Sequence, residues 1–599
     1  MRVAYRIGAA APKSHLFDVV LRIEDITADS VTLRMPAWIP GSYMIRDYAR
    51  HVVAVQARDA DGVLINVDRP DKSSWRIAAA EESLSVLLQV YAFDVSVRGA
   101  HLDATHAYFN GVCVFPEVLG AEGELPVTID RPIDLPDSAV VATSLRAVDI
   151  DAAGFGAYVA EDYDALIDQP VEIAEQTQVT FDVDGIAHRF YVRGEHDFDT
   201  QRLGDETARV CHEHHALLGR PTDLDRYVFM AYALDQGYGG LEHRWSTSLE
   251  ISRKDLPRDN VTHDVDAWRK CLGLISHEYF HLWNVRRLKP AAFTPIDPTQ
   301  ENHTGLLWVF EGITSYYDDL AMVRSGVISI DEYLQLLGQM LTRVYRMPGR
   351  WRQSLEQSSF DAWTRFYKQD ENSANAIISY YTKGAMAALA LDLTLRRDTS
   401  TTLDAVMRAC WQRFYLDDAS GMPERGIEAV VSELAQQDMR EFFDAWIRGT
   451  DDIDLKPILA SVGIELHLRA AAPGSDAGGK PAAKTPTTWT GLRFAANDPN
   501  RVAAVINGSP GEQAGICVGD RLIALAGKRV GAAGLASLML GRQPGDALSC
   551  HLFRGESLLE TTITLVAPPN DTAWLTLDQA ADDATLARRE RWLSSLRLD

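Results

Sequence analysis

His277, Glu278 and His281 stand at the spacing of an HExxH motif, in the run His277-Glu278-Tyr279-Phe280-His281. Two histidines four residues apart lie on one face of a helix, so both imidazoles can reach a single metal ion. Glu278 lies one step round the helix, where its carboxylate can accept a proton from the water that the metal activates. The spacing therefore predicts a zinc-dependent peptidase with Glu278 as the general base.

A catalytic zinc ion needs a third protein ligand and one open coordination position. Glu311 lies in the next strongly helical segment, among the apolar residues Trp308, Val309, Phe310 and Ile313. A carboxylate buried there without a cation would be costly, whereas an ordinary surface glutamate would be solvated. We expect Glu311 to complete the ligand set, with one zinc ion per chain.

A second histidine-rich run spans Cys211-His212-Glu213-His214-His215. No glutamate follows the first histidine of an i, i+4 pair in this run, so it does not have the geometry of the zinc helix, the segment that carries His277 and His281. We expect a solvated polar face of a helix.

The chain carries 59 Lys and Arg residues against 84 Asp and Glu residues, a formal net charge of −25. Nucleic-acid binders and proteins that bind anionic membranes need basic surfaces, so both classes are disfavoured. The six cysteines are far apart and form no CxxC pair, which argues against a disulfide scaffold. We see neither a signal peptide nor an apolar run of the ~18–20 residues that span a bilayer, and we expect a cytoplasmic protein.

The 599 residues suggest three or four domains at ~100–200 residues each, with a multidomain α+β fold. Short β-rich segments predict an N-terminal β-sandwich of two stacked sheets over 1–170. Helical patterns dominate the predicted catalytic domain over 171–455. A β-rich module is predicted over 456–570; it includes an Ala/Gly/Pro-rich flexible insert at 470–488 and is followed by a charged helical tail at 571–599.

Four segments together resemble the glycyl aminopeptidase family of gluzincin metallopeptidases, the PDZ-bearing relatives of aminopeptidase N. They are MPAWIPGSYMIRDYARHV (35–52), HEYFHLWNVRRLKP (277–290), LLWVFEGITSYYDDL (306–320) and DAWIRGTDDIDL (444–455). The resemblance implies a thermolysin-like zinc peptidase domain and an aminopeptidase that prefers small N-terminal residues such as Gly or Ala. Its substrates would be peptides with a free N-terminus.

The run GYGGLEH (237–243) is similar to the substrate-binding motif of related aminopeptidases. Glu242 would then bind the free α-amine of the substrate, and Gly239 and Gly240 would let the substrate backbone approach. His243 and Leu241 depart from the usual Asn and Met of that motif. In YYTKGA (380–385), the resemblance implies a tyrosine that stabilises the oxyanion, with Tyr381 favoured over Tyr380.

The basic residues Arg286, Arg287 and Lys289 follow the zinc helix. They are able to bind a substrate carboxylate, but we expect a solvated basic patch.

Near the C-terminus, the sequence resembles a PDZ domain. Gly491, Leu492, Arg493 and Phe494 match the loop that captures the C-terminal carboxylate of a peptide ligand through backbone N–H groups. A PDZ-shaped packing module that binds no ligand is the alternative. For the whole chain, the alternatives to an aminopeptidase are a zinc endopeptidase and a PDZ adaptor with a retired protease domain.

Overall fold

The computed structural model of the protein describes residues 1–79, 82–258, 265–482, 484–531, 534–535 and 538–596. It has two compact units. The first comprises Met1–Asn302, Asp418–Gly421 and Leu596–Asp599, and the second comprises His303–Asp417 and Met422–Ser595. The predicted α+β class with a β-rich N-terminal region is confirmed. Residue 483 of the predicted insert and residues 597–599 of the predicted tail lie outside the described residues.

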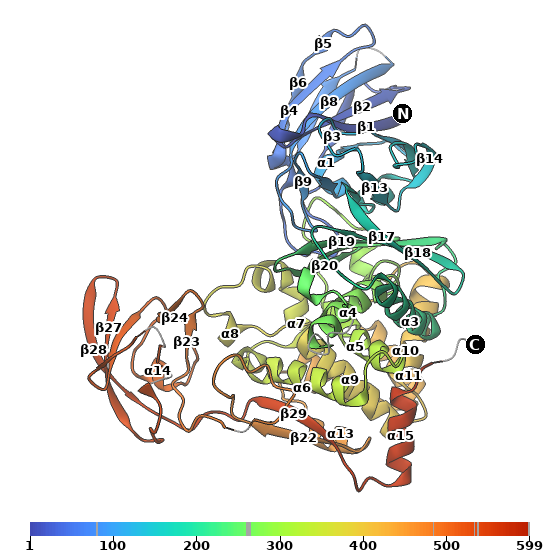
Figure 1. The fold of residues 1–599 in the computed structure, drawn as a ribbon. Helices are drawn as coiled ribbons and strands as arrows, with labels where there is room; N and C mark the ends of the chain where they lie inside the picture. The colour runs from blue at the N-terminus through green and yellow to red at the C-terminus, as the bar shows by residue number, and fades with distance from the viewer. Residues whose placement is uncertain (80–81, 259–264, 483, 532–533, 536–537, 597–599) are drawn as a thin grey trace. The chain divides into compact units, whose positions relative to one another are not determined.

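The N-terminal region of the first unit folds into three sheets (Figure 1, blue to teal), where the sequence predicted two. The largest has the order β14 (Arg146–Ile150), β15 (Gly156–Ala160), β12 (Leu125–Ile129), β1 (Arg2–Ala11), β2 (Leu16–Glu24), β8 (Ser83–Tyr91), β4 (Val52–Arg58) and β5 (Leu64–Ile65). The second has the order β13 (Val140–Thr143), β16 (Val171–Ala174), β10 (Ala107–Phe109) and β9 (Ala100–Leu102). The third has the order β11 (Glu117–Val118), β3 (Ser30–Arg34), β7 (Ser74–Ala78) and β6 (Val67–Asp68).

Strands β1, β2, β3 and β8 alternate buried side chains with more exposed ones, as the period of two in a pleated strand requires. In β2, for example, Phe17, Val19, Leu21 and Ile23 are buried and join one continuous apolar core. The additional sheet arises because strands such as β3 and β7 pair with each other instead of joining the large sheet. Local patterns of alternation identify strands but carry no information on which strands pair.

A five-stranded sheet completes the first unit, in the order β17 (Gln176–Val183), β18 (Ile186–Arg193), β19 (Arg226–Leu234), β21 (Ser246–Ser252) and β20 (Tyr238–Glu242). Strands β18, β19 and β21 run parallel, and β20 lies antiparallel to β21 at the edge. Helix α3 (Thr200–Leu218) connects β18 to β19, and helix α4 (Val265–Phe280) packs against α3 and β20 (Figure 1, green). The edge position leaves one side of β20 without a strand partner among the described residues, as peptide binding by strand addition requires.

The second unit is built on helices. They include α5 (Thr314–Arg324), α6 (Ile330–Tyr345), α9 (Thr382–Asp398), α10 (Leu403–Trp411) and α11 (Gly426–Ala435). Helix α6 begins at a capping box in which Ser329 and Glu332 satisfy each other's backbone N–H groups. Helix α9 is buried around nearly its whole circumference, which makes it the central helix of the unit.

The C-terminal module has a sheet of its own, with β23 (Leu492–Ala495), β24 (Asp498–Val505), β25 (Arg521–Leu525), β27 (Ala547–Arg554) and β28 (Ser557–Thr564) in that order (Figure 1, orange to red). It encloses a separate apolar core that includes Val502, Leu522 and Ile563. A separate core is the mark of an independent domain.

The predicted helical tail over 571–599 is wrong in its first part. Residues Thr572–Leu577 form strand β29, which pairs with β22 (Ile464–Arg469) and packs on α6. The helix is confined to α15 (Asp583–Leu593), whose Trp592 is fully buried and donates its indole N–H to the Tyr316 hydroxyl. The strand was missed because its partner lies about a hundred residues earlier in the chain.

The predicted flexible insert at 470–488 makes defined contacts with its own unit. The Asp476 carboxylate forms an ion pair with Arg469, and its backbone carbonyl accepts a hydrogen bond from Arg346 of the loop after α6. Gly478 and Gly479 approach α6 so closely that a Cβ at either would overlap it. The glycines therefore serve close packing as well as chain reversal.

Among the described residues, no helix has both the length and the apolar character needed to cross a membrane.

Candidate active site

Helix α4 brings the two histidines of the HExxH motif together. The ring centroids of His277 and His281 lie 4.7 Å apart with an interplanar angle of 87°. His281 Nδ1 lies 2.7 Å from the backbone oxygen of Asn284, so Nδ1–H is the donor and the lone pair that could bind a metal is on Nε2. In a zinc-binding histidine, a hydrogen bond from the ring nitrogen that does not bind the metal fixes the tautomer. The α4 residues therefore fit a zinc ion.

Two carboxylates lie beside His281 in the first unit. Glu242, Glu278 and His281 each offer one ligand atom, and these atoms lie within 4.8 Å of one another. Both carboxylates are almost fully buried, with 4% and 5% exposure for Glu242 and Glu278. A Cβ at Gly240 of β20 would overlap the Glu278 carboxylate, so this strand must carry glycine here to admit the Glu278 side chain.

The segment 35–52 supports the Glu242 side chain. Gly41 has φ +93°, and a Cβ there would lie 2.5 Å from Oε1 of Glu242. Only glycine satisfies both the backbone angle and the contact. Segment 35–52 therefore contacts the site through Gly41, whereas the sequence alone indicated only its resemblance to the family.

A buried ion network holds the chain just after Glu242. His243 Nδ1 lies 3.0 Å from Oδ1 of Asp168, and Arg286 pairs with the same carboxylate at 2.5 Å. Burial would raise the pKa of Asp168, but Arg286 and the His243 hydrogen bond hold it well below its usual range. His243 is thus a structural link to the residues that follow the zinc helix.

The predicted solvated basic patch after the zinc helix is wrong for Arg286 and Arg287. Arg286 is 6% exposed and pairs with Asp168, and Arg287 is 4% exposed and forms two hydrogen bonds of 3.0 Å to Asp223. Burial and the nearby Arg286 lower the pKa of Lys289 to about 8. The acidic partners lie far away in sequence, so no local pattern indicates these pairs.

The histidine run on α3 is also buried, which corrects the predicted solvated face. His214 Nε2 lies 2.9 Å from the Ser276 hydroxyl, and His215 Nε2 lies 2.9 Å from the Tyr279 hydroxyl. Both partners belong to α4, so the run packs against the helix that carries His277 and His281. Only His212 of the run has an exposed imidazole.

In the second unit, Glu311 lies in the π-helical turn Trp308–Gly312 and is 2% exposed. Such turns occur often at functional sites because they redirect one side chain out of the helical repeat. Gly312 meets Gly384 of α9 in a contact that leaves no room for a Cβ on either residue. This contact holds the turn against the start of α9. The convergence of Glu311 with His277 and His281 stays a prediction.

Tyr380 and Tyr381 immediately precede α9, with ring centroids 4.7 Å apart. Tyr380 is fully buried, whereas Tyr381 is partly exposed. An oxyanion donor must reach the substrate, so the burial supports Tyr381 over Tyr380.

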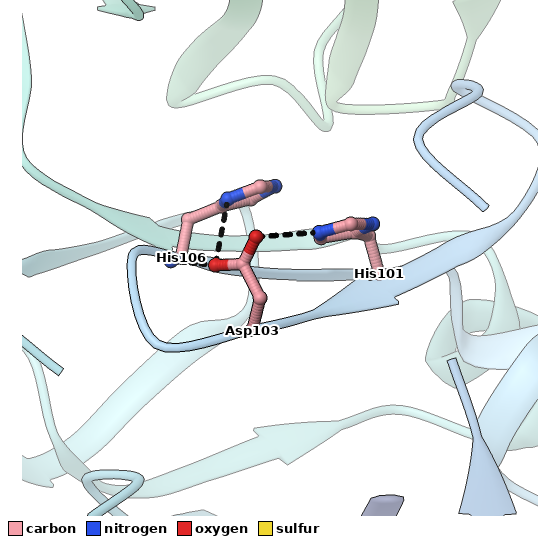
Figure 2. Close-up of side chains that lie close together, drawn as sticks. All are labelled: His101, Asp103 and His106. Atoms are coloured by element: carbon pink, nitrogen blue, oxygen red, sulfur yellow. Dashed lines mark hydrogen bonds and ion pairs between the residues drawn. The ribbon is translucent and has the colours of Figure 1, made fainter. Parts of the chain in front are cut away.

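A further histidine cluster, which no sequence motif indicated, comprises His101 of β9 with Asp103 and His106 of the turn to β10, here named the β9–β10 turn (Figure 2). His101 Nε2 lies 3.0 Å from Asp103 Oδ2, and His106 Nδ1 lies 3.5 Å from Asp103 Oδ1. The two rings are stacked at 4.4 Å with an interplanar angle of 8°. A metal ion lies in the plane of each imidazole that binds it, and two stacked parallel rings do not share such a position.

The predicted PDZ loop begins at Gly491, with φ +71°, and leads into β23. Arg493 donates from Nη2 to the backbone oxygen of Arg346 at 3.0 Å. Leu492 and Phe494 pack against the core of the module. Capture of a peptide C-terminus by this loop stays a prediction.

Three parts of the chain match models of known protein families. Residues 4–175 match the Peptidase M61 N-terminal domain, residues 270–387 match M61 glycyl aminopeptidase, and residues 501–544 match a PDZ domain. No curated protein sequence matches the chain.

Two solved structures illustrate the structural likeness. An aminopeptidase N family protein from Idiomarina loihiensis is 33% identical and has a TM-score of 0.93, with 99% of this chain and 100% of that chain covered. An M1 zinc metallopeptidase from Deinococcus radiodurans is 14% identical and has a TM-score of 0.47, with 76% of this chain and 95% of that chain covered.

Proposed function

The chain belongs to the M61 glycyl aminopeptidase family and is a zinc-dependent aminopeptidase, and from this premise we propose that it removes glycine or alanine from peptide N-termini. The observation that supports cleavage at a free N-terminus is the cluster of Glu242, Glu278 and His281, whose ligand atoms lie within 4.8 Å of one another, and the preference for glycine or alanine rests on the family resemblance. One carboxylate near the metal position would act as a base and the other would bind the substrate amine. An endopeptidase has no need for the second.

We propose that His277, His281 and Glu311 hold one zinc ion per chain. The Nδ1 hydrogen bond to Asn284 sets the tautomer of His281 with its lone pair on Nε2, and Glu311 is a buried carboxylate that a cation would stabilise. When bound, zinc supplies the Lewis acidity that makes water reactive near neutral pH and polarises the scissile carbonyl.

Glu278 is the general base. Its carboxylate is confined between α4 and the glycine strand β20, so a peptide lying along β20 presents its scissile bond beside this carboxylate. Glu278 accepts the proton of the attacking water and later donates it to the leaving amine. Tyr381 donates its phenolic O–H to the oxyanion that develops on the carbonyl.

Glu242 pairs with the α-ammonium group of the substrate. Its position is fixed on one side by Gly41 and on the other by His243, which is held by Asp168. A fixed, almost fully buried carboxylate discriminates strongly, because a blocked N-terminus would leave its charge unpaired. The exopeptidase character therefore rests on this residue.

The test is a pair of matched peptides, Ala-Ala-Ala and its N-acetylated form, assayed with and without a chelator. We expect rapid, chelator-sensitive cleavage of the free peptide and at least about 100-fold slower cleavage of the blocked one. Glu242→Gln should slow cleavage of the free peptide by a similar factor and leave the blocked peptide little changed. Equal cleavage of the two peptides by the wild-type enzyme would favour an endopeptidase, and absence of all turnover in zinc-replete enzyme would favour the retired protease domain. Replacing the N-terminal alanine with leucine tests the preference for small residues.

A further inference from the structure

Arg98, from the segment that precedes β9, contacts the glycine strand of the active site. Its Nη2 donates to the backbone oxygen of Gly240 at 2.9 Å, and a Cβ at Gly239 would lie 3.9 Å from its Nη1. Gly240 is the residue against which the Glu278 carboxylate packs. A guanidinium group thus lies at the edge of β20, on the same glycine that the Glu278 carboxylate contacts.

The direction of a bound peptide follows from the proposed function, on which this inference rests. The substrate amine is held at Glu242, the C-terminal end of β20, and the scissile bond lies beside Glu278 at Gly240. The chain beyond that bond must then run toward Gly239 and Tyr238, antiparallel to β20. Residues on the leaving side of the scissile bond therefore approach Arg98.

Arg98 also lines a cavity of about 660 Å³ in the same unit. The wall includes two further arginines, Arg46 and Arg50, and the aromatic side chains of Tyr48 and Phe93. Of the two acidic residues in the wall, Asp47 is paired with Lys72 at 2.6 Å. Three guanidinium groups outnumber the carboxylates, so the cavity favours an anionic occupant.

The backbone that carries Arg98 is held firmly. The Val97 N–H donates to the Glu250 carboxylate of β21 at 2.9 Å, and the Tyr48 hydroxyl donates to the backbone oxygen of Arg98 at 2.9 Å. Asn110 Nδ2 donates to the backbone oxygens of Val97 and Gly99 at 2.8 and 3.1 Å. A guanidinium group on so fixed a backbone binds a ligand with little loss of conformational entropy.

We propose that Arg98 and this cavity form a subsite for the C-terminal carboxylate of short peptide substrates. A guanidinium group carries five N–H donors in a planar fork, so one side chain can hold Gly240 and a carboxylate together. Because Arg98 lies one or two residues beyond the scissile bond, the subsite fits di- and tripeptides. Longer peptides place an uncharged amide there. Arg98 is thus a specificity-determining residue that favours the last steps of peptide breakdown.

The first experiment needs no variant. Kinetic constants of the zinc-loaded enzyme are measured for Ala-Ala, Ala-Ala-Ala and Ala-Ala-Ala-Ala-Ala-Ala, each as the free acid and as the C-terminal amide. For the two short peptides we expect kcat/KM to be about tenfold or more higher for the acid, mainly through KM, because an arginine–carboxylate hydrogen bond is strong. For the hexapeptide, acid and amide should be equivalent. Raised ionic strength should reduce the preference, because the subsite is partly exposed.

The second experiment assigns the preference to a residue. Arg98→Ala should bring the acid-to-amide ratio of Ala-Ala-Ala to about one, and Arg98→Lys should retain part of it. The matched control is Arg58→Ala, an exposed arginine of β4 that donates to Gly62, which should keep the wild-type ratio. Equal cleavage of short acids and amides by the wild-type enzyme overturns the subsite, while a retained requirement for the free amine leaves the proposed function standing. Loss of the amine requirement would instead count against the proposed function.

Discussion

Two places in the first unit bring histidine and carboxylate groups within reach of one another, and they differ in ring geometry. On α4, the rings of His277 and His281 meet edge to face at 87°. In the β9–β10 turn, the rings of His101 and His106 lie flat on each other at 8°. A helix presents residues four apart side by side, so their ring nitrogens can converge on one ion. The turn stacks its rings, which favours packing over metal binding.

The charges around the two places also favour metal binding at α4 over the β9–β10 turn. Beside α4, Glu242 of β20 and Glu278 of α4 itself add negative charge near His281. In the turn, Asp103 is already saturated, since it accepts hydrogen bonds from the Thr105 N–H and hydroxyl and from the His106 N–H. Burial, and next the nearby Arg193, lower the pKa of His106 to about 3. The first place offers two carboxylates to a cation, whereas the second offers one carboxylate that already accepts several hydrogen bonds, so residue type alone does not identify a metal site.

The largest expected effect separates these two places by their metal content. His277→Ala should reduce bound zinc from about one ion per chain to near zero and abolish turnover, because two remaining ligands hold zinc poorly. His101→Ala should keep one zinc ion per chain and most of the activity. Elemental analysis of dialysed protein measures both. Loss of one equivalent of metal from the His101 variant would show that the turn binds an ion after all.

The next expected effect distinguishes a residue that binds the metal from one that acts only in catalysis. Glu278→Gln keeps the size of the side chain and removes the base, so zinc content should stay at the wild-type level while kcat falls by about 10²–10⁴-fold. Elemental analysis and peptide kinetics on the same preparation measure the two quantities. A variant that loses zinc together with activity would place Glu278 among the ligands, and one that retains full activity would remove it from the mechanism.

The local parts of the site could be predicted from the sequence. The spacing of His277, Glu278 and His281 determines their common helix face, and the α+β class follows from strand and helix periodicity. Glu311 was expected in an ordinary helix, but it lies in a π-helical turn. Apolar periodicity near 3.6 residues predicts helix and does not distinguish one wide turn within it.

The long-range contacts that position these residues could not be predicted. Asp168 lies 75 residues from His243 and still fixes its ring, and Arg98 lies 142 residues from Gly240. No periodicity links such pairs, because they meet only through the tertiary fold. The buried histidines of α3 were misjudged for the same reason: their hydroxyl partners Ser276 and Tyr279 lie on another helix.

The smallest effect concerns the stability of the β9–β10 turn. The pKa of His106 is lowered to about 3 in the fold, whereas an unfolded histidine titrates near 6.5. As the pH falls from about 6.5 toward 3, the unfolded chain takes up a proton that the folded turn refuses, so the free energy of unfolding decreases. The slope from this residue is at most about 1.4 kcal/mol per pH unit.

Thermal unfolding between pH 7 and 5 measures this effect. We expect the melting temperature to fall with pH in the wild-type protein and to fall less in His106→Gln, which cannot take up the proton. His551→Gln, on β27 of the PDZ module, is the matched control and should keep the wild-type slope. An unchanged slope in the His106 variant would mean that the ring titrates normally in the fold. His106 would then be able to take up a proton in the folded protein. Only the ring geometry would distinguish the turn from the zinc helix.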